Sequence, residues 1–113
     1  MKATKFIKDH GVKRAREVVK NHPALNATHY RARDNKYSAS FKPSIEIVYV
    51  ADLKRLVESV DRVNQRGGYL AAKELLSFSI VHQETFGKNA VVDEIISSLK
   101  GEIADYESIY GEE

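Results

Sequence analysis

The chain has 113 residues, of which 42% are hydrophobic and 30% are charged, and these values are ordinary for one globular domain. It contains no cysteine, which excludes disulfides, thiol catalysis and zinc sites built on cysteine. The N-terminal segment has no apolar region of the signal-peptide kind, and no apolar run approaches the roughly 20 residues that cross a bilayer. We therefore expect a single domain over residues 1–113, in the cytoplasm and without a membrane partner.

The net charge of +2 conceals an uneven distribution. Residues 1–42 hold 11 Lys and Arg against 3 Asp and Glu, whereas residues 43–113 hold 7 against 13. Such asymmetry favours either an anionic partner for the first part or complementary packing of the two halves. Two solvated faces of opposite sign are the simpler interpretation, because exposed charges contribute little on their own.

Two short helices are predicted at the N-terminus. Thr4 can cap the first, which places Phe6 and Ile7 inside, and the glycine after it breaks the helix. The second covers 12–21 and stops before Pro23, because the residue preceding a proline leaves the helical region. Its basic residues, which lie off the apolar face, are Lys13, Arg14, Arg16 and Lys20.

Alternating apolar and polar side chains predict two strands, 28–33 and 36–42. A two-residue turn between them would place Tyr30 opposite Ala39, with the apolar side chains of both strands on one face. A third strand is expected at 45–50, which would complete an antiparallel meander.

The opposite face of this hairpin is the best candidate binding surface, because it is cationic and holds no acid. Its residues are His29, Arg31, Arg33, Lys36 and Lys42. Together with the basic residues of the second helix, they could neutralise the phosphates of a nucleic acid. Stacking on bases would strengthen this hypothesis, but the register puts Tyr30, Tyr37 and Phe41 on the other face.

The second half of the chain is predicted to be helical. Asp52 caps a helix that Gly67 ends. The apolar stripe of this helix consists of Leu53, Leu56, Val57, Val60 and Val63. Another helix starts near Tyr69, and residues 77–86 are either its continuation or a short strand. The fold class is therefore α+β: N-terminal helices, a three-stranded antiparallel β-meander, then two or three packed helices.

The last helix, which Asn89 caps, carries apolar residues at alternating spacings of four and three, as in a heptad seam. They are Val92, Ile96, Leu99, Ile103, Tyr106 and Tyr110. The seam is short for a dedicated coiled coil, so packing within the domain is favoured over a homodimer interface. In a homodimer, the contact residues would be Leu99, Ile103, Tyr106 and Tyr110.

No nucleotide-binding, hydrolase or metalloprotease motif occurs in the sequence. The four histidines lack the spacing of metal ligands, and Glu84 has no partner for acid–base chemistry. A helix-turn-helix interpretation around Gly67-Gly68 is disfavoured, because the second helix offers few side chains that read bases. We therefore expect no catalytic residue, cofactor or metal.

The segment DLKRLVES, followed by Val63, Gly67-Gly68 and Leu70-Ala-Ala-Lys, resembles a group of small accessory proteins of lambda-like bacteriophages and prophages of enteric bacteria. The segments FIKDHGVKRAREVV and LKGEIADYESIYGEE resemble the same group. This resemblance implies a cytoplasmic protein made in an infected or lysogenic host, and it carries no established activity or binding residue.

These observations favour a non-enzymatic binding module that acts on a host or phage protein. Nucleic-acid binding through the cationic hairpin face is the alternative interpretation. A third interpretation is self-association through the last helix.

Overall fold

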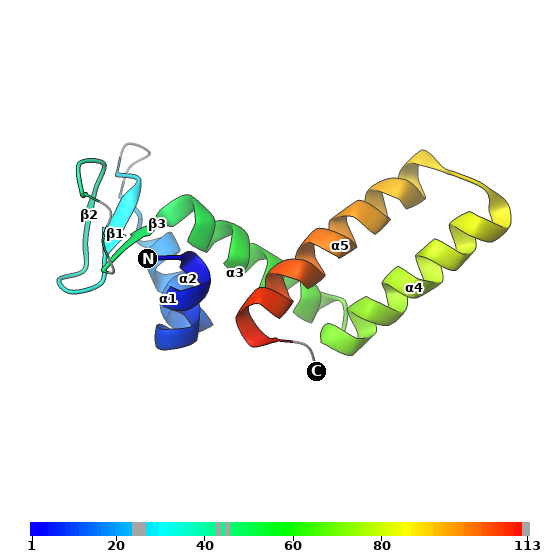
Figure 1. The fold of residues 1–113 in the computed structure, drawn as a ribbon, viewed down its shortest axis with the longest axis horizontal. Helices are drawn as coiled ribbons and strands as arrows, with labels where there is room; N and C mark the ends of the chain where they lie inside the picture. Colours follow the sequence, from blue (N-terminus) through cyan, green and yellow to red (C-terminus); the bar gives the residue numbers. More distant parts are fainter. Residues whose placement is uncertain (24–26, 43, 45, 112–113) are drawn as a thin grey trace. The chain divides into compact units, whose positions relative to one another are not determined.

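The computed structural model describes residues 1–23, 27–42, 44 and 46–111, which form helices and a small sheet (Figure 1). The helices are α1 (Ala3–His10), α2 (Val12–Lys20), α3 (Val50–Gln65), α4 (Tyr69–Phe86) and α5 (Ala90–Tyr110), and the strands are β1 (His29–Arg31), β2 (Lys36–Ser38) and β3 (Ile47–Tyr49). This arrangement confirms the predicted α+β class. No helix in the described chain is both long and apolar enough to cross a membrane.

The chain groups into two compact units, Met1–Glu58 and Ser59–Glu113. The boundary falls inside α3, so one continuous helix contributes residues to both units. The apolar stripe predicted for this helix is buried from Leu53 to Val63. That a single domain spans the whole chain stays a prediction.

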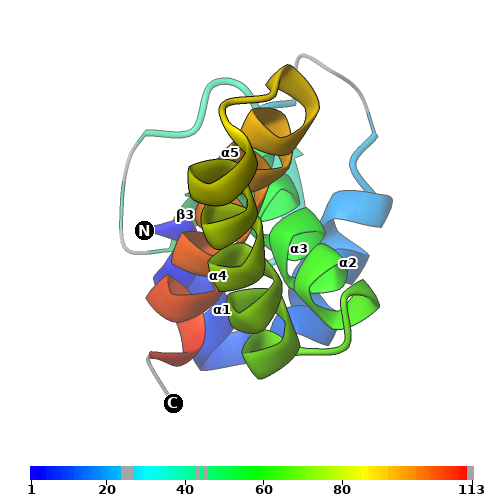
Figure 2. The ribbon, with the colours of Figure 1, turned by 90° about the vertical axis from the view of Figure 1, so that its right-hand side faces the viewer.

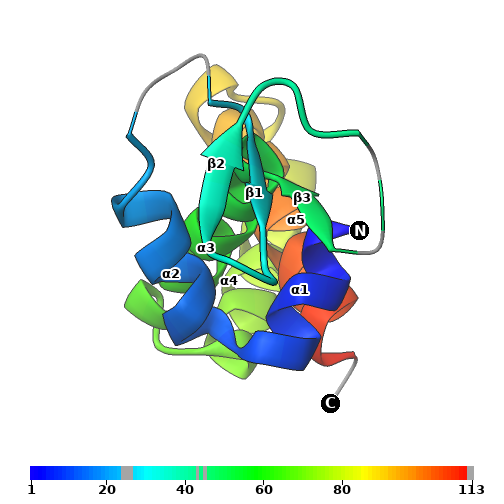
Figure 3. The ribbon, with the colours of Figure 1, turned by 90° about the vertical axis from the view of Figure 1, so that its left-hand side faces the viewer.

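The sheet of the first unit has the strand order β2-β1-β3, with both pairs antiparallel (Figure 3). A meander would have placed β2 in the middle, so the predicted strand order is wrong. The connection over 39–46 is long enough to carry the chain back to the free edge of β1, where the Ala32 N–H donates to the Glu46 carbonyl (3.0 Å). β1 is therefore the central strand.

The hairpin register also differs from the prediction, because Tyr30 lies opposite Tyr37 and not opposite Ala39. The turn takes four residues, 32–35, and ends at Asn35 in the left-handed region with φ +57°. The predicted strand over 36–42 ends at Ser38. The third strand is shorter than the predicted 45–50, and residue 45 lies outside the described part of the chain.

The core of the first unit is built from α1, α2, the sheet and the start of α3. Its most deeply buried large side chains are Phe6, Tyr30, Val48, Leu53 and Leu56. The rings of Phe6 and Tyr30 meet edge to face with centroids 5.9 Å apart, and α1 packs against α2 and contacts β3. Tyr30 thus belongs to the core, as predicted.

In the second unit, α4 and α5 lie side by side and run antiparallel (Figure 1, Figure 2). Residues 77–86 are helical throughout, so this segment continues the helix that begins at Tyr69 and does not form the short strand that was the other prediction. The core cluster consists of Val63, Tyr69, Ala72, Leu99 and Ile103, with Leu76 and Tyr106 packed against it. Asn89 caps α5 through its side-chain oxygen, which accepts from the Val91 N–H (2.9 Å).

The heptad seam of α5 faces this core. Leu99 is fully buried and Ile103 is 5% exposed, whereas Tyr110 is 48% exposed. Packing within the unit therefore accounts for the seam. A second copy would find Leu99 and Ile103 covered, so these two residues do not offer a contact surface.

Candidate functional site

The cationic hairpin face contains acids that the sequence interpretation did not place there. Arg31 donates to both carboxylate oxygens of Asp34 (2.9 and 2.7 Å), and Arg33 Nη1 lies 3.7 Å from a carboxylate oxygen of Glu46. The hydrogen bond from Arg31 lowers the pKa of Asp34, and the same bond raises the pKa of Arg31. The prediction of a face without acids is therefore wrong.

The position of Phe41 was also predicted wrongly. The Arg31 guanidinium lies over its ring, 4.4 Å from the centroid, so the two side chains share a face. Strand alternation fails here because β2 ends at Ser38, three residues before Phe41. Arg31 is thus held by a carboxylate and by a ring, which leaves it less available to a phosphate.

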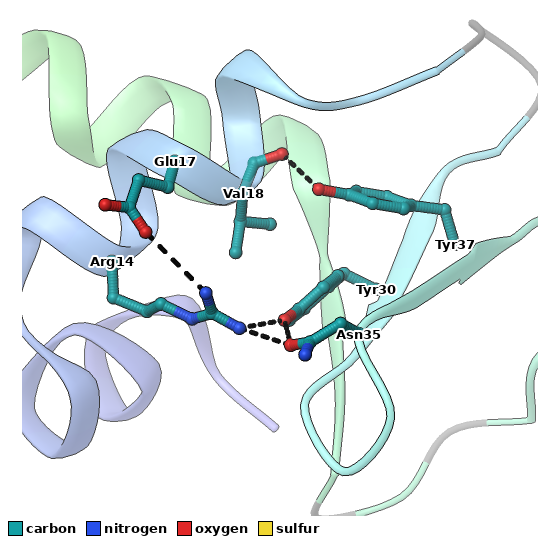
Figure 4. A network of polar contacts seen from close by, with 6 residues as sticks. All are labelled: Arg14, Glu17, Val18, Tyr30, Asn35 and Tyr37. Carbon is teal, nitrogen blue, oxygen red and sulfur yellow. Dashed lines mark hydrogen bonds and ion pairs between the residues drawn. The ribbon is translucent and has the colours of Figure 1, made fainter.

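Arg14 joins a polar network between α2 and the hairpin (Figure 4). Its guanidinium donates to the Tyr30 hydroxyl (2.8 Å) and to the Asn35 side-chain oxygen, and the Tyr30 hydroxyl donates to that same oxygen. The Tyr37 hydroxyl donates to the Val18 carbonyl (2.7 Å), and burial raises the pKa of Tyr37. These contacts attach α2 to the hairpin, so Arg14 has a structural role.

The other predicted cations remain at the surface of the first unit. The exposed members are Lys13, Arg16, Lys20, Lys36 and Lys42. His29 is half-buried, with its ring 5.3 Å from that of Tyr49. The structure therefore retains a basic surface on this unit, but it removes Arg14 and Arg31 as freely available phosphate ligands, whereas the Arg33 side chain stays 63% exposed beside Glu46.

The most unusual surface of the second unit is apolar. Large hydrophobic side chains on α4 and α5 are exposed to solvent, namely Leu70 (65%), Phe78 (69%), Val81 (58%), Phe86 (75%) and Val91 (67%). An amphipathic surface helix keeps its apolar residues on one buried stripe, whereas those of α4 extend around its circumference. α4 therefore has more apolar surface than α5 covers.

A groove of about 300 Å³ lies on this apolar surface. Its lining residues are Leu75, Phe78, Ser79 and His82 on α4, Val92 and Ile95 on α5, and Arg66. Arg66 donates to both carboxylate oxygens of the buried Glu102 (2.9 and 3.4 Å), so its charge is compensated. The Ser79 hydroxyl donates to the Leu75 carbonyl (2.8 Å). The groove is thus a mainly apolar hollow in which Arg66 and Ser79 are already bonded, while His82 is exposed at its rim with its ring 4.8 Å from that of Phe86.

A larger hollow of about 420 Å³ lies in the first unit, lined by Val19, His22, Thr28, Tyr49 and Lys54 among others. The polar groups of His22 and Thr28 are already bonded, to the Ala27 carbonyl and to the ring of His29. Among the described residues of the chain, no three His, Asp or Glu side chains converge as metal ligands.

The sequence interpretation missed the groove, although one signal was available. The apolar residues of 69–86 recur at spacings that do not form a single stripe, and this pattern indicates a helix covered on more than one side. Which of these residues would remain uncovered depended on how α5 packs against α4, and the sequence does not show that packing.

Comparison with known proteins gives no relationship from which a function follows. No family model, no curated protein and no solved structure matches the chain.

Proposed function

We propose that the protein is a non-enzymatic binding module whose α4–α5 groove receives an amphipathic helix of a partner protein. The observation that supports this is the exposed apolar surface around Phe78, since large exposed apolar patches on soluble proteins mark interaction sites. Hydrophobic grooves between helices bind the apolar face of a partner helix in a recurrent recognition mode.

The dimensions of the groove suit a helix. On α4 the groove is lined from Leu75 to His82, and seven steps of 1.5 Å between them give about 10 Å, which matches about two turns of a bound helix. A helix lying along α4 and α5 would pack at the usual interaxial distance of about 8–10 Å. No strand edge is present in the described part of the second unit, so addition of a β-strand is not available there.

The groove also offers enough apolar surface to contribute substantially to the free energy of binding a partner helix. Covering one large side chain such as Phe78 contributes about 1.5–3 kcal/mol. Three or four such contacts would offset the cost of association for a moderately tight complex. The resemblance to phage accessory proteins supports a host or phage protein in the bacterial cytoplasm as the source of the helix.

A model peptide tests the proposal directly. The probe is a labelled amphipathic helix of about 18 residues, with Leu at helical spacing and Gln elsewhere, titrated by fluorescence anisotropy. We expect saturable binding that Phe78→Ser weakens about tenfold, corresponding to about 1.4 kcal/mol. The control is Tyr110→Ser, which removes an exposed aromatic ring of α5 that does not line the groove.

Equal affinity for wild type and Phe78→Ser would contradict the proposal, and so would the absence of binding. Circular dichroism of each variant verifies that α4 and α5 remain folded.

Nucleic-acid binding by the first unit is the second candidate function. The observation that favours it is composition: residues 1–58 hold 13 Lys and Arg against 6 Asp and Glu. The ion pairs of Arg31 and Arg33 weaken the hairpin as a phosphate-binding surface, so this candidate now depends on the exposed lysines.

A further inference from the structure

We infer that the first unit holds a separate small-molecule site, a hollow that takes an organic carboxylate with an apolar body. The hollow has a volume of about 420 Å³, and the described residues that line it all belong to the first unit. Sites for small ligands usually have volumes of about 300–1,000 Å³. This site uses no residue of the α4–α5 groove, so it goes beyond the proposed function and does not depend on it.

Segments that are distant in the sequence form the walls of the hollow and are bonded to one another. The walls come from the end of α2, the residue before β1, and the junction of β3 with α3. The Thr28 carbonyl accepts from the Val50 N–H (2.9 Å), and the Val18 carbonyl accepts from the Tyr37 hydroxyl (2.7 Å). The hollow is therefore formed before a ligand arrives, which lowers the cost of binding.

The walls are suited to an apolar body. Val19, Val50 and Ala51 contribute aliphatic side chains. Tyr49 adds a ring that is 43% exposed and lies beside the ring of His29, with centroids 5.3 Å apart. Since the polar groups of His22 and Thr28 are already bonded within the unit, they do not require a polar partner from a ligand.

Lys54 gives the hollow its charge. It is the only Lys, Arg, Asp or Glu among the described residues that line the hollow, and it lies one helical turn after Val50. Within the described part of the chain it forms no ion pair or hydrogen bond, although Glu58 lies one turn further along α3. The Lys54 ammonium is therefore available to an anion.

The other acids of the first unit are engaged elsewhere. Four of the six are paired with other cations, namely Asp9, Glu17, Asp34 and Glu46. Asp52 lines a different hollow, together with Arg55. The net charge of +7 on residues 1–58 also favours an anion over a cation. One ammonium compensates one negative charge, so a carboxylate matches the site better than a phosphate group, which carries almost two.

Three probes that share one ring system test the site: naphthoate, naphthylmethanol and naphthylmethylamine. Each is titrated into the isotope-labelled full chain, and affinities are taken from the shifts of amide resonances. We expect shifts at Val19, Tyr49 and Lys54. Naphthoate should bind about three- to tenfold more tightly than the alcohol, and the amine should bind most weakly.

Two variants separate the charge of the hollow from its shape. Lys54→Gln should remove the preference for naphthoate over the alcohol, whereas Ala51→Leu narrows the hollow and should weaken both probes about tenfold. Both residues are exposed, and leucine keeps the helix propensity of α3, so the fold is retained. The matched control is Lys13→Gln, which removes an exposed charge that does not line the hollow and should leave both affinities unchanged.

Each other result overturns the inference. Equal affinities for the three probes would remove the carboxylate as the ligand class. A naphthoate preference that Lys13→Gln reduces as much as Lys54→Gln does would show general attraction to a basic unit. Shifts confined to Phe78 and Ile95 would place the probes in the α4–α5 groove, and no shift with any probe would exclude the hollow as a binding site. Peptide binding by the groove would stand or fall separately.

Discussion

At the scale of single residues, the main correction concerns what the cationic side chains do. Arg14, Arg31 and Arg33 were grouped by charge as phosphate ligands, yet each meets a polar or acidic neighbour within the first unit. The sequence predicted that Tyr30 is buried, because alternation with its neighbours is a strong local signal. It could not predict the pairing of Arg33 with Glu46, since that contact depends on β3 lying beside β1.

The network in Figure 4 predicts that Arg14 stabilises the fold. Arg14→Gln should lower the free energy of unfolding by about 1 kcal/mol, because it removes charge-assisted hydrogen bonds to Tyr30 and Asn35 at a partly exposed site. Lys13→Gln, at the exposed neighbouring position, is the control and should change stability by less than about 0.5 kcal/mol. Urea unfolding measures both, and equal stabilities would refute the structural role.

The burial of Tyr37 leads us to expect that the free energy of unfolding decreases at alkaline pH. Burial raises its pKa above the ordinary value, so the folded state holds the phenol proton more tightly than the unfolded state does. The resulting stabilisation is present below the unfolded pKa of about 10 and is lost as pH rises through the folded pKa. Thermal unfolding between pH 7 and 11 should therefore show a smaller loss of stability for Tyr37→Phe than for wild type. Parallel curves for the two proteins would argue against this account.

At the scale of elements, helices were more predictable than strands. The stripe of α3 and the cap at Asn89 are local features, and both are observed. The hairpin register failed because the turn length is set by side chains of the turn, with Arg31 bound to Asp34 and Asn35 bound to Tyr30. Contacts of this kind act across the turn and are not visible in the alternation of the strands.

In the α4–α5 pair, we expect substitution of a buried apolar residue to lower the stability much more than substitution of an exposed one. Leu99→Ala should destabilise the protein by about 2–5 kcal/mol, because it leaves a cavity beside Val63 and Ile103. Phe78→Ser should change stability by less than about 0.5 kcal/mol, since its side chain is 69% exposed. Urea titrations followed by circular dichroism provide the comparison. A large loss for Phe78→Ser would mean that its ring is covered within the protein, which would remove it from the binding surface.

At the scale of the whole molecule, charge and apolar exposure are segregated along the chain. Residues 1–58 carry a net charge of +7 and residues 59–113 a net charge of −5, and exposed apolar side chains concentrate on α4 and α5. The sequence revealed the charge asymmetry, but the groove became visible only when the packing of α5 against α4 was known.

The basic first unit gives a prediction for the alternative function. If it binds nucleic acid, its affinity for a DNA or RNA oligonucleotide should fall steeply as the salt concentration rises. The double variant Lys20→Gln/Lys36→Gln should reduce the slope of log affinity against log salt concentration by about one to two, which corresponds to the loss of one or two phosphate contacts. Electrophoretic mobility shifts over a salt series measure both. Unchanged slopes in the double variant, or no complex at low salt, would exclude the lysines as phosphate ligands.

The most direct test of the central claim is to map a bound helix on the molecule by NMR. Titration of the isotope-labelled protein with the amphipathic Leu/Gln peptide should shift the amide resonances of Leu75, Phe78, His82, Val92 and Ile95, and should leave those of α1 and α2 in place. Shifts confined to the first unit, or spread evenly over acidic residues without involvement of the groove, would contradict the account.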